Sequence, residues 1–305
     1  MTDGRATVAV VGLGSIGGII AASLCAAGRN DVIACVRQPI DRLTLERPDD
    51  TVDVTIRALT DPAEAKPVQW VLLCTKTYQT RSAAPWLAKL CDRRTRVAVL
   101  QNGIGHAAQL APYVGGATVI PIIVYYNGER LAPDRVRFRR AGEHDLVASD
   151  NADGRAFAEL LAGTGMRILL SEDFHTLAWR KLLVNAVANP ITALTQQRQA
   201  VLRRPDVKDL CLAVLAEAKT VADADDAHLR TDEPAQIMAT LMTYPPDAGT
   251  SMYFDRMAGR PLEIEALTGA IVAAAERHHI ATPLNRALLT LLRPVSESGE
   301  NGLTA

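Results

Sequence analysis

A glycine-rich turn between a strand and a helix, near the start of the chain, constrains the fold more than any other feature. Thr7–Val11 is apolar and rich in β-branched residues, and residues 19–27 have the composition of a buried helix. Between them, Gly12, Gly14 and Gly17 follow the spacing G-x-G-x-x-G. In this context the first glycine permits a tight turn, the second leaves room for a pyrophosphate, and the third lets the helix approach the strand.

The turn therefore predicts a dinucleotide-binding unit, with phosphates held by the free N–H groups at the start of the helix. A flexible turn without a ligand is the simpler alternative, but the flanking strand and helix favour a binding site. The residues predicted to bind the cofactor here are Gly12, Leu13, Gly14, Ser15, Ile16 and Gly17.

The end of the second strand bears on the choice of cofactor. Dinucleotide sites for NAD usually place an acid there to bind the ribose 2′-hydroxyl, whereas NADP sites place an arginine near the 2′-phosphate. The strand expected at 31–36 is followed by Arg37, and Asp31 stands at its opposite end. The sequence favours NADP over NAD, with a solvated surface arginine as the alternative.

Strands and helices go on alternating through the first half of the chain, which is typical of a parallel, doubly wound sheet. We expect strands at 70–75, 96–100, 118–124 and 166–170, helices at 82–90, from 106 and at 155–161, and short antiparallel additions at 135–138 and 145–148. Helices are expected from there on, at 174–196, 207–223, 233–242, 251–257 and 263–278. The prediction is an α/β fold: an N-terminal Rossmann domain over residues 1–170 and an all-helical domain over 171–305, with a disordered tail after about residue 295.

Length and composition agree with two ordered domains. The chain has 305 residues, enough for two domains of ordinary size. Its formal net charge of -1 provides no bulk field for nucleic acid or an anionic membrane. The five cysteines show no metal-binding or CxxC spacing, and no apolar run approaches the ~18 residues of a membrane span. We expect a cytoplasmic protein without disulfides, bound metal, a secretion signal, or membrane or nucleic-acid partners.

A polar stripe interrupts the otherwise apolar helix expected around residues 178–190. Lys181, Asn185 and Asn189 are spaced four apart and share one face, and Pro190 should end or kink the helix. Buried polar groups need partners. These could be loop carbonyls, with Lys181 reaching solvent, or a ligand that carries a carbonyl and a carboxylate. Hydride delivery to a ketone leaves an alkoxide, which a lysine of lowered pKa could protonate while asparagines orient the substrate.

Together with further motifs, this stripe makes the sequence resemble the ketopantoate reductase (2-dehydropantoate 2-reductase) family almost end to end. The segments that carry the resemblance are GLGSIGG at 12–18, CTKTYQT around Lys76 and Gln79, QNGIG at 101–105, WRKLLVNAVANPITAL at 179–194, SMYFDRMAGRPLEIEALTG at 251–269 and TPLN at 282–285. The resemblance implies NADPH-dependent reduction of ketopantoate to pantoate in pantothenate synthesis, in a cleft between the two domains.

The resemblance also implies roles for individual residues. Lys181 would be the catalytic acid, while Asn102, Asn185, Asn189, Ser251 and Glu263 would hold the substrate, Ser251 at its carboxylate and Glu263 at its hydroxyl. Arg37 would contact the 2′-phosphate, and Lys76, Gln79 and Asn102 would lie beside the cofactor. Taken singly, Ser251 could instead be a helix N-cap, Glu263 a capping acid and Asn102-Gly103 an ordinary turn.

One region departs from the family pattern, at residues 121–149. Tyr125 and Tyr126 are bulky there, and Arg135, Arg137, Arg139 and Arg140 add positive charge. The segment could reshape the substrate pocket or simply form an altered edge hairpin. Two rival functions also stay open, a dehydrogenase for another small 2- or 3-hydroxy acid and a non-catalytic NADP(H)-binding sensor. The sequence leaves the oligomeric state open, a homodimer being one arrangement.

Overall fold

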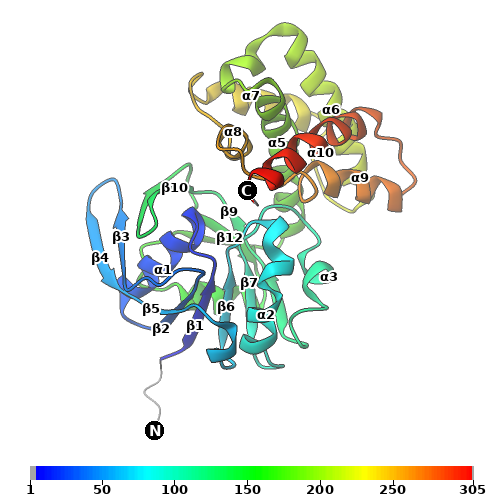
Figure 1. The fold of residues 1–305 in the computed structure, drawn as a ribbon. Coiled ribbons are helices and arrows are strands. Elements are labelled where there is room, and N and C mark those ends of the chain that lie inside the picture. The colour runs from blue at the N-terminus through cyan, green and yellow to red at the C-terminus, as the bar shows by residue number, and fades with distance from the viewer. Residues whose placement is uncertain (1–4, 304–305) are drawn as a thin grey trace. The chain divides into compact units, whose positions relative to one another are not determined.

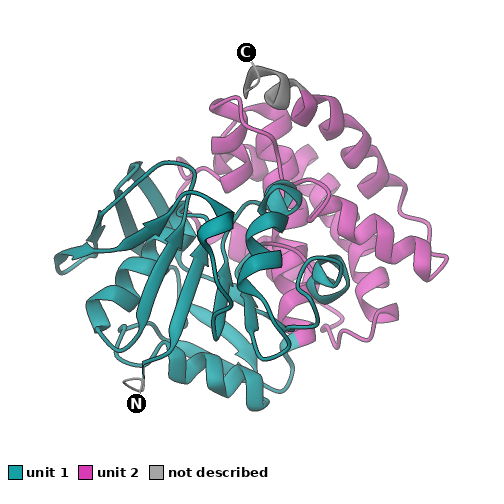
Figure 2. Cartoon of the chain, turned by 60° about the horizontal axis from the view of Figure 1, so that its bottom comes forward, with its two compact units in different colours: residues 1–101, 105–174 teal, residues 102–104, 175–305 magenta. Residues whose placement is uncertain are grey.

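The chain folds into two compact units, which differ in architecture. The computed structural model describes the backbone of residues 5–303 and the side chains of residues 5–297. Unit 1 comprises residues 1–101 and 105–174, and unit 2 comprises 102–104 and 175–305 (Figure 2). The division falls close to the expected boundary at 170/171, but the short segment Asn102–Ile104 groups with the helical unit.

Unit 1 contains the predicted doubly wound sheet. Its strands are β1 (Thr7–Val11), β2 (Asp31–Cys35), β5 (Arg57–Leu59), β6 (Trp70–Leu73), β7 (Arg96–Val99) and β8 (Thr118–Pro121), in the order β5-β2-β1-β6-β7-β8 and parallel throughout. Alternate residues of β1 enter different cores: Val8 and Val10 pack with α1 (Ser15–Ala27), whereas Ala9 and Val11 pack with α2 (Thr80–Leu90). The period of two and the helices on both faces confirm the predicted α/β fold.

A second sheet, which the sequence did not predict, packs on α1 (Figure 1). It joins β10 (Asn127–Ala132), β11 (Arg135–Arg139), β3 (Arg42–Glu46) and β4 (Thr51–Thr55) in that order. Small residues make the contact close, since a Cβ on Gly18 would lie 2.7 Å from Val136 and one on Gly128 would lie 2.9 Å from Ile19. β3 and β4 were not predicted, because their charged and exposed residues weaken the apolar pattern by which strands are recognised.

The single strand expected at 118–124 is instead two strands in different sheets. β8 ends at Pro121, and β9 (Ile123–Val124) pairs antiparallel with β12 (Leu146–Ser149), which also pairs parallel with β13 (Ile168–Ser171). The expected additions β11 and β12 therefore each have one antiparallel and one parallel neighbour. The remaining helices of unit 1 are α3 (His106–Leu110) and α4 (Ala152–Leu160), with short 3-10 turns at Pro62–Glu64 and Thr77–Gln79.

Three arginines of the departing segment pair with acids on the second sheet. Arg135 and Arg137 donate to the two carboxylate oxygens of Glu46 at 2.6 and 2.7 Å, and Arg137 and Arg139 also reach Glu129. Tyr126 is buried, and its hydroxyl donates to the Ile16 carbonyl at 3.1 Å. These contacts favour the edge-hairpin interpretation, in which the new residues brace the sheet against α1.

All secondary structure described in unit 2 is helical, which confirms the predicted second domain. The elements are α5 (Phe174–Thr195), a 3-10 helix (Gln199–Arg203), α6 (Pro205–Ala224), α7 (Glu233–Thr243), α8 (Ser251–Met257), α9 (Thr268–Arg277) and α10 (Pro283–Leu303). α5 is the central helix, and most of its residues from Leu182 to Ala193 are buried. None of the described helices combines the length and apolar character needed to cross a bilayer.

α5 continues through Pro190 to Thr195, near the predicted end of this helix at residue 196, so Pro190 does not end it. Two expectations for this unit were wrong. α9 begins at Thr268 rather than at residue 263. The stretch after residue 295, expected to be disordered, continues α10 as far as Leu303, and residues 304–305 lie outside the described part.

The TPLN motif lies at the start of α10, where the carboxylate of Glu217 accepts hydrogen bonds from it. The backbone N–H groups of Leu284 and Asn285 each donate to Glu217 at 3.0 Å, and Asn285 Nδ2 donates to the same carboxylate at 2.9 Å. Asn285 is fully buried and also donates to the Val214 carbonyl. Glu217 on α6 therefore caps α10 and fixes the packing of the two helices.

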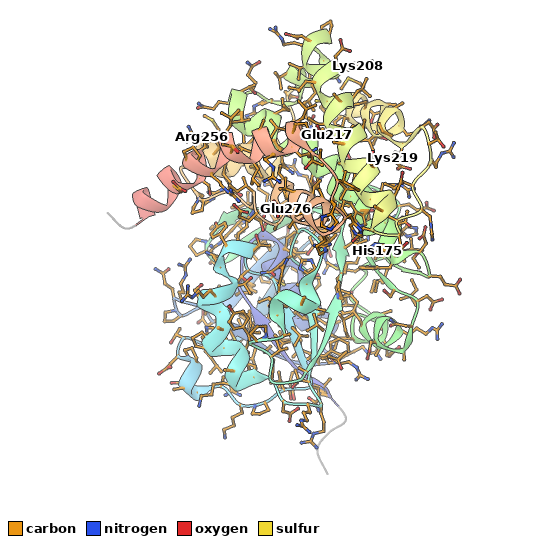
Figure 3. The ribbon with its side chains drawn as sticks, turned by 90° about the vertical axis from the view of Figure 1, so that its right-hand side faces the viewer. His175, Lys208, Glu217, Lys219, Arg256 and Glu276 are labelled. Carbon is orange, nitrogen blue, oxygen red and sulfur yellow. The ribbon has the colours of Figure 1, made fainter. Side chains whose placement is uncertain are left out.

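Substituting Glu217 with alanine should lower the free energy of unfolding by about 2 kcal/mol or more, because two backbone donors and one buried amide lose their acceptor. Urea denaturation followed by circular dichroism measures the loss. Glu276, labelled with Glu217 in Figure 3, gives the matched control: it pairs with Arg286 on the surface, so Glu276→Ala should cost less than about 0.5 kcal/mol. Equal effects of the two substitutions would contradict the capping role.

Candidate active site

The glycine turn of unit 1 has the sterics that a dinucleotide site requires. Gly12 has a φ of +94°, and a Cβ there would lie 2.8 Å from the Thr75 side chain. A Cβ on Gly17 would lie 1.9 Å from the Gly12 carbonyl oxygen. By contrast, a Cβ on Gly14 would have no atom within 4 Å among the described residues. The turn is thus tight at Gly12 and Gly17 and open at Gly14, where a pyrophosphate would approach α1.

The other predicted cofactor residues follow the carboxyl ends of neighbouring parallel strands. Arg37 is exposed just after β2, and Lys76 and Gln79 follow β6, where the Lys76 N–H donates to the Gln79 side chain at 3.3 Å. Gln101, at the end of β7, donates to the Thr75 carbonyl at 3.0 Å and ties the two strand ends together. Parallel strands end at one edge of their sheet, so Gly12–Gly17, Arg37, Lys76 and Gln79 share the edge where such folds bind ligands.

In unit 2, Lys181 belongs to a charged group with Glu263 and Asn102. Burial lowers the pKa of Lys181 from 10.5 to about 8, while the negative charge of Glu263 acts in the opposite direction. Glu263 is only 6% exposed, and Asn102 Nδ2 donates to its Oε2 at 3.2 Å. A Cβ on Gly103, whose φ is +100°, would lie 2.5 Å from the Ala266 carbonyl oxygen. The Asn102-Gly103 turn is therefore fitted to the segment that carries Glu263.

The two asparagines of the stripe form a second group with α8. Asn189 Nδ2 donates to Asn185 Oδ1 at 3.1 Å, and Asn189 Oδ1 accepts from the Met252 N–H at 3.2 Å and from Ser251 Oγ at 3.4 Å. The N-cap of α8 is Thr250, whose hydroxyl accepts from the Tyr253 N–H. Ser251 is exposed, and the alternative that made it the N-cap was wrong.

All the predicted substrate residues thus fall within unit 2. The alternative of Glu263 as a capping acid was wrong, because α9 begins only at Thr268. The groups offer an ammonium, an amide and a hydroxyl as donors and one buried carboxylate as acceptor, which suits a small acid with a ketone and a hydroxyl. Among the described residues, no group of three or more His, Cys, Asp or Glu side chains could hold a metal ion.

Sequence reasoning missed the residues that support these groups. Thr192, fully buried on α5, lies 2.7 Å from the Thr250 hydroxyl. Thr192 follows Asn189 by three residues, so it lies near the stripe, but the spacing of four leads to Ala193 and does not find it. Arg180, beside Lys181, binds both oxygens of Glu233 at 2.5 and 3.2 Å and anchors α5 to α7. No sequence spacing predicts the pair of Arg180 and Glu233.

Comparisons with known proteins cover nearly the whole chain. Residues 8–151 match the family model for ketopantoate reductase PanE/ApbA, and residues 173–296 match the model for its C-terminal part. The 2-dehydropantoate 2-reductase of Mycobacterium tuberculosis H37Rv is 39% identical over 292 residues, which is 95% of this chain and 98% of the relative. A dimeric ketopantoate reductase from Staphylococcus aureus superposes with a TM-score of 0.84 at 29% identity, covering 96% of this chain and 99% of that one.

The same fold also serves another enzyme. A D-mandelate dehydrogenase, solved in a ternary complex with NADH and anilino(oxo)acetate, superposes with a TM-score of 0.82 at 21% identity, covering 96% of this chain and 99% of that one. At that identity the likeness concerns the fold alone. Substrate and cofactor must therefore be argued from the residues of the site.

Replacing Glu263 with glutamine should lower the pKa of Lys181 below its value of about 8, because the ammonium loses an attractive negative charge while its burial is unchanged. The pKa can be read from the pH dependence of the side-chain NMR signals of Lys181, assigned with a Lys181→Arg variant. Glu265→Gln, which removes a surface partner of Arg293, is the control and should leave that pKa in place. An unchanged or raised pKa in Glu263→Gln would show that the two groups do not interact.

Proposed function

This chain belongs to the ketopantoate reductase family, and we propose that it reduces 2-dehydropantoate to pantoate with NADPH. It is accordingly an oxidoreductase that acts on a CH–OH group and uses a nicotinamide cofactor. The observation that carries the proposal is Lys181, a lysine with a pKa lowered to about 8 in a group with Glu263 and Asn102. Perturbed lysines of this kind are typical of proton-transfer sites.

The residues of the turn fit the cofactor. Gly12, Leu13, Gly14, Ser15, Ile16 and Gly17 would hold the pyrophosphate, with Lys76, Gln79 and Asn102 further along the cofactor and Arg37 at the 2′-phosphate. The open space at Gly14 supports this assignment. The planar guanidinium of Arg37 suits a phosphate better than a ribose hydroxyl, which is why NADPH is proposed rather than NADH. When bound, NADPH supplies the hydride that adds to C2 of the substrate.

Lys181 then supplies the proton. As the C2 carbonyl becomes an alkoxide, the Lys181 ammonium donates a proton from Nζ to that oxygen and is left as a neutral amine. A pKa of about 8 keeps the ammonium largely protonated near neutral pH and makes it a stronger acid than an ordinary lysine. Glu263 accepts from the substrate hydroxyl, and Asn102 holds the Glu263 carboxylate in place. Asn185 donates to the substrate oxygens, and so does Ser251 once its hydroxyl turns away from Asn189.

Two other functions compete with this proposal. One is a dehydrogenase for another small 2- or 3-hydroxy acid, since the fold by itself does not determine the substrate. Against it, a buried acceptor such as Glu263 discriminates for a substrate with a hydroxyl donor, because a substrate without one leaves the carboxylate unpaired. A non-catalytic NADP(H) sensor would have no use for an acidified lysine beside a carboxylate.

Further parts of the proposal concern the setting of the enzyme. We place it in the cytoplasm, in pantothenate synthesis, where its substrate would be a small 2-oxo acid rather than a macromolecule. The dimeric ketopantoate reductase from Staphylococcus aureus supports a homodimer.

A substrate panel tests the reaction directly. Purified protein should oxidise NADPH with ketopantoate at a kcat/KM about 100-fold or more above that for 2-oxoisovalerate, which lacks the hydroxyl that Glu263 would bind. NADH should be the poorer cofactor. Pyruvate, 6-phosphogluconate and benzoylformate complete the panel. A preference for benzoylformate would assign the chain to another hydroxy acid, and tight NADPH binding without any turnover would favour the sensor.

The pH dependence tests the role of Lys181. Because the protonated lysine is the acid, kcat/KM for reduction should be level below the pKa of about 8 and fall about tenfold per pH unit above it. Lys181→Ala should lower kcat by about 100-fold or more and abolish this alkaline limb. Lys219→Ala, which removes an ion pair with Asp223 on α6 (Figure 3), is the control and should leave rate and profile unchanged. A folded Lys181→Ala variant with wild-type turnover would refute the mechanism.

A further inference from the structure

Asn185 and Asn189 have different environments although they share one face of α5. Asn189 is only 3% exposed, whereas Asn185 is half-buried. We propose that Asn189 is a positioning residue: it holds the amide of Asn185 so that its nitrogen, and not its oxygen, is presented to the substrate. The proposal rests on the function above, and it assigns to the substrate a hydrogen-bond acceptor, a carboxylate or ketone oxygen, opposite Asn185.

A backbone group anchors the orientation of Asn189. The Met252 N–H can only donate, so the Asn189 atom that lies 3.2 Å from it must be the amide oxygen. Ser251 Oγ donates to the same oxygen at 3.4 Å. The nitrogen of Asn189 must then face the other way, toward Asn185 at 3.1 Å. Asn185 has to meet that donor with its oxygen, which leaves its nitrogen as the end available to a ligand.

A chain of hydroxyl groups keeps the anchoring N–H in place. The Thr192 hydroxyl lies 2.7 Å from the Ala188 carbonyl, to which it donates, and 2.7 Å from Thr250 Oγ1, a contact in which either hydroxyl can be the donor. Thr250 in turn accepts from the Tyr253 N–H at 3.1 Å. The first turn of α8 is therefore fastened to α5 at two points, Thr192 and Asn189.

The two asparagines therefore have different roles, which the sequence did not predict. Sequence reasoning assigned both asparagines to the substrate, on their shared spacing and on the family resemblance. The oxygen of Asn189 accepts from α8 and its nitrogen donates to Asn185, and the side chain is almost completely buried. Asn185 is the one that can contact a ligand, and it can do so only as a donor.

A double-mutant cycle tests the proposal. In Asn189→Asp an oxygen still accepts from the Met252 N–H, but no proton is left to donate to Asn185, so the Asn185 amide should turn over and present its oxygen. We expect Asn189→Asp and Asn185→Ala each to lower kcat/KM for ketopantoate by about 10- to 100-fold. The double variant should match Asn185→Ala within about twofold, because Asn189 acts through Asn185. Losses that multiply, or a fully active Asn189→Asp, would overturn the inference.

Matched variants separate this effect from general damage. Asn151→Asp makes the same chemical change at the N-cap of α4, where Asn151 accepts from the Gly154 N–H at 2.8 Å, and should leave kcat/KM unchanged. Melting temperature and NADPH affinity should stay near wild type in all variants. Should Asn189→Asp not fold, Asn185→Asp replaces it: it keeps the acceptor for Asn189 and removes the donor toward the substrate, and wild-type kcat/KM in it would overturn the proposal.

The wild-type protein distinguishes the two possible failures. A wild type that turns over none of the 2-oxo acids refutes the proposed function, and with it the role of Asn185, before any variant is measured. An active wild type whose Asn189→Asp and Asn185→Ala losses multiply refutes the positioning role alone.

Discussion

The geometry of the substrate side depends on one constraint: polar side chains on a buried helix must find hydrogen-bond partners inside the protein. α5 carries four such side chains: Asn189 and Thr192 are buried, and Lys181 and Asn185 are partly buried. Asn185, Asn189 and Thr192 each bond a neighbour on α5 or the first turn of α8. The requirement for partners therefore places α8, and with it Ser251, beside the helix that carries the proposed acid.

The same constraint bears on chemistry at Lys181. Desolvation disfavours the charged form of the lysine, and Glu263 compensates in part. A carboxylate placed here raises the lysine pKa, and the Asn102 amide satisfies one of its oxygens. The opposing effects of burial and of the Glu263 charge hold the pKa of Lys181 at about 8, close to physiological pH. Such a balance is sensitive, because loss of Glu263 would lower the lysine pKa further, whereas loss of the burial would raise it.

Much of the fold could be predicted from local pattern. The glycine turn, the alternating strands of the main sheet and the helices of unit 2 each leave a periodic signal within one segment. β3, β4 and α10 were not predicted: the two strands are short and partly charged, and they are stabilised by α1 and β11, which are distant in sequence. α10 depends on Glu217, which precedes Leu284 by 67 residues and so lies beyond the reach of any local pattern.

The sequence by itself determined which residue types could do the chemistry. The glycine turn and the lysine on an apolar helix can each be recognised from the residues next to them in the chain. The sequence also determined the family, since several motifs occur together at family spacing. Only the tertiary structure decided that Thr250 rather than Ser251 caps α8, that Asn102 and Glu263 meet, and that the two asparagines differ. Those facts depend on contacts between distant segments, and the direction of a hydrogen bond is settled only when both partners are in place.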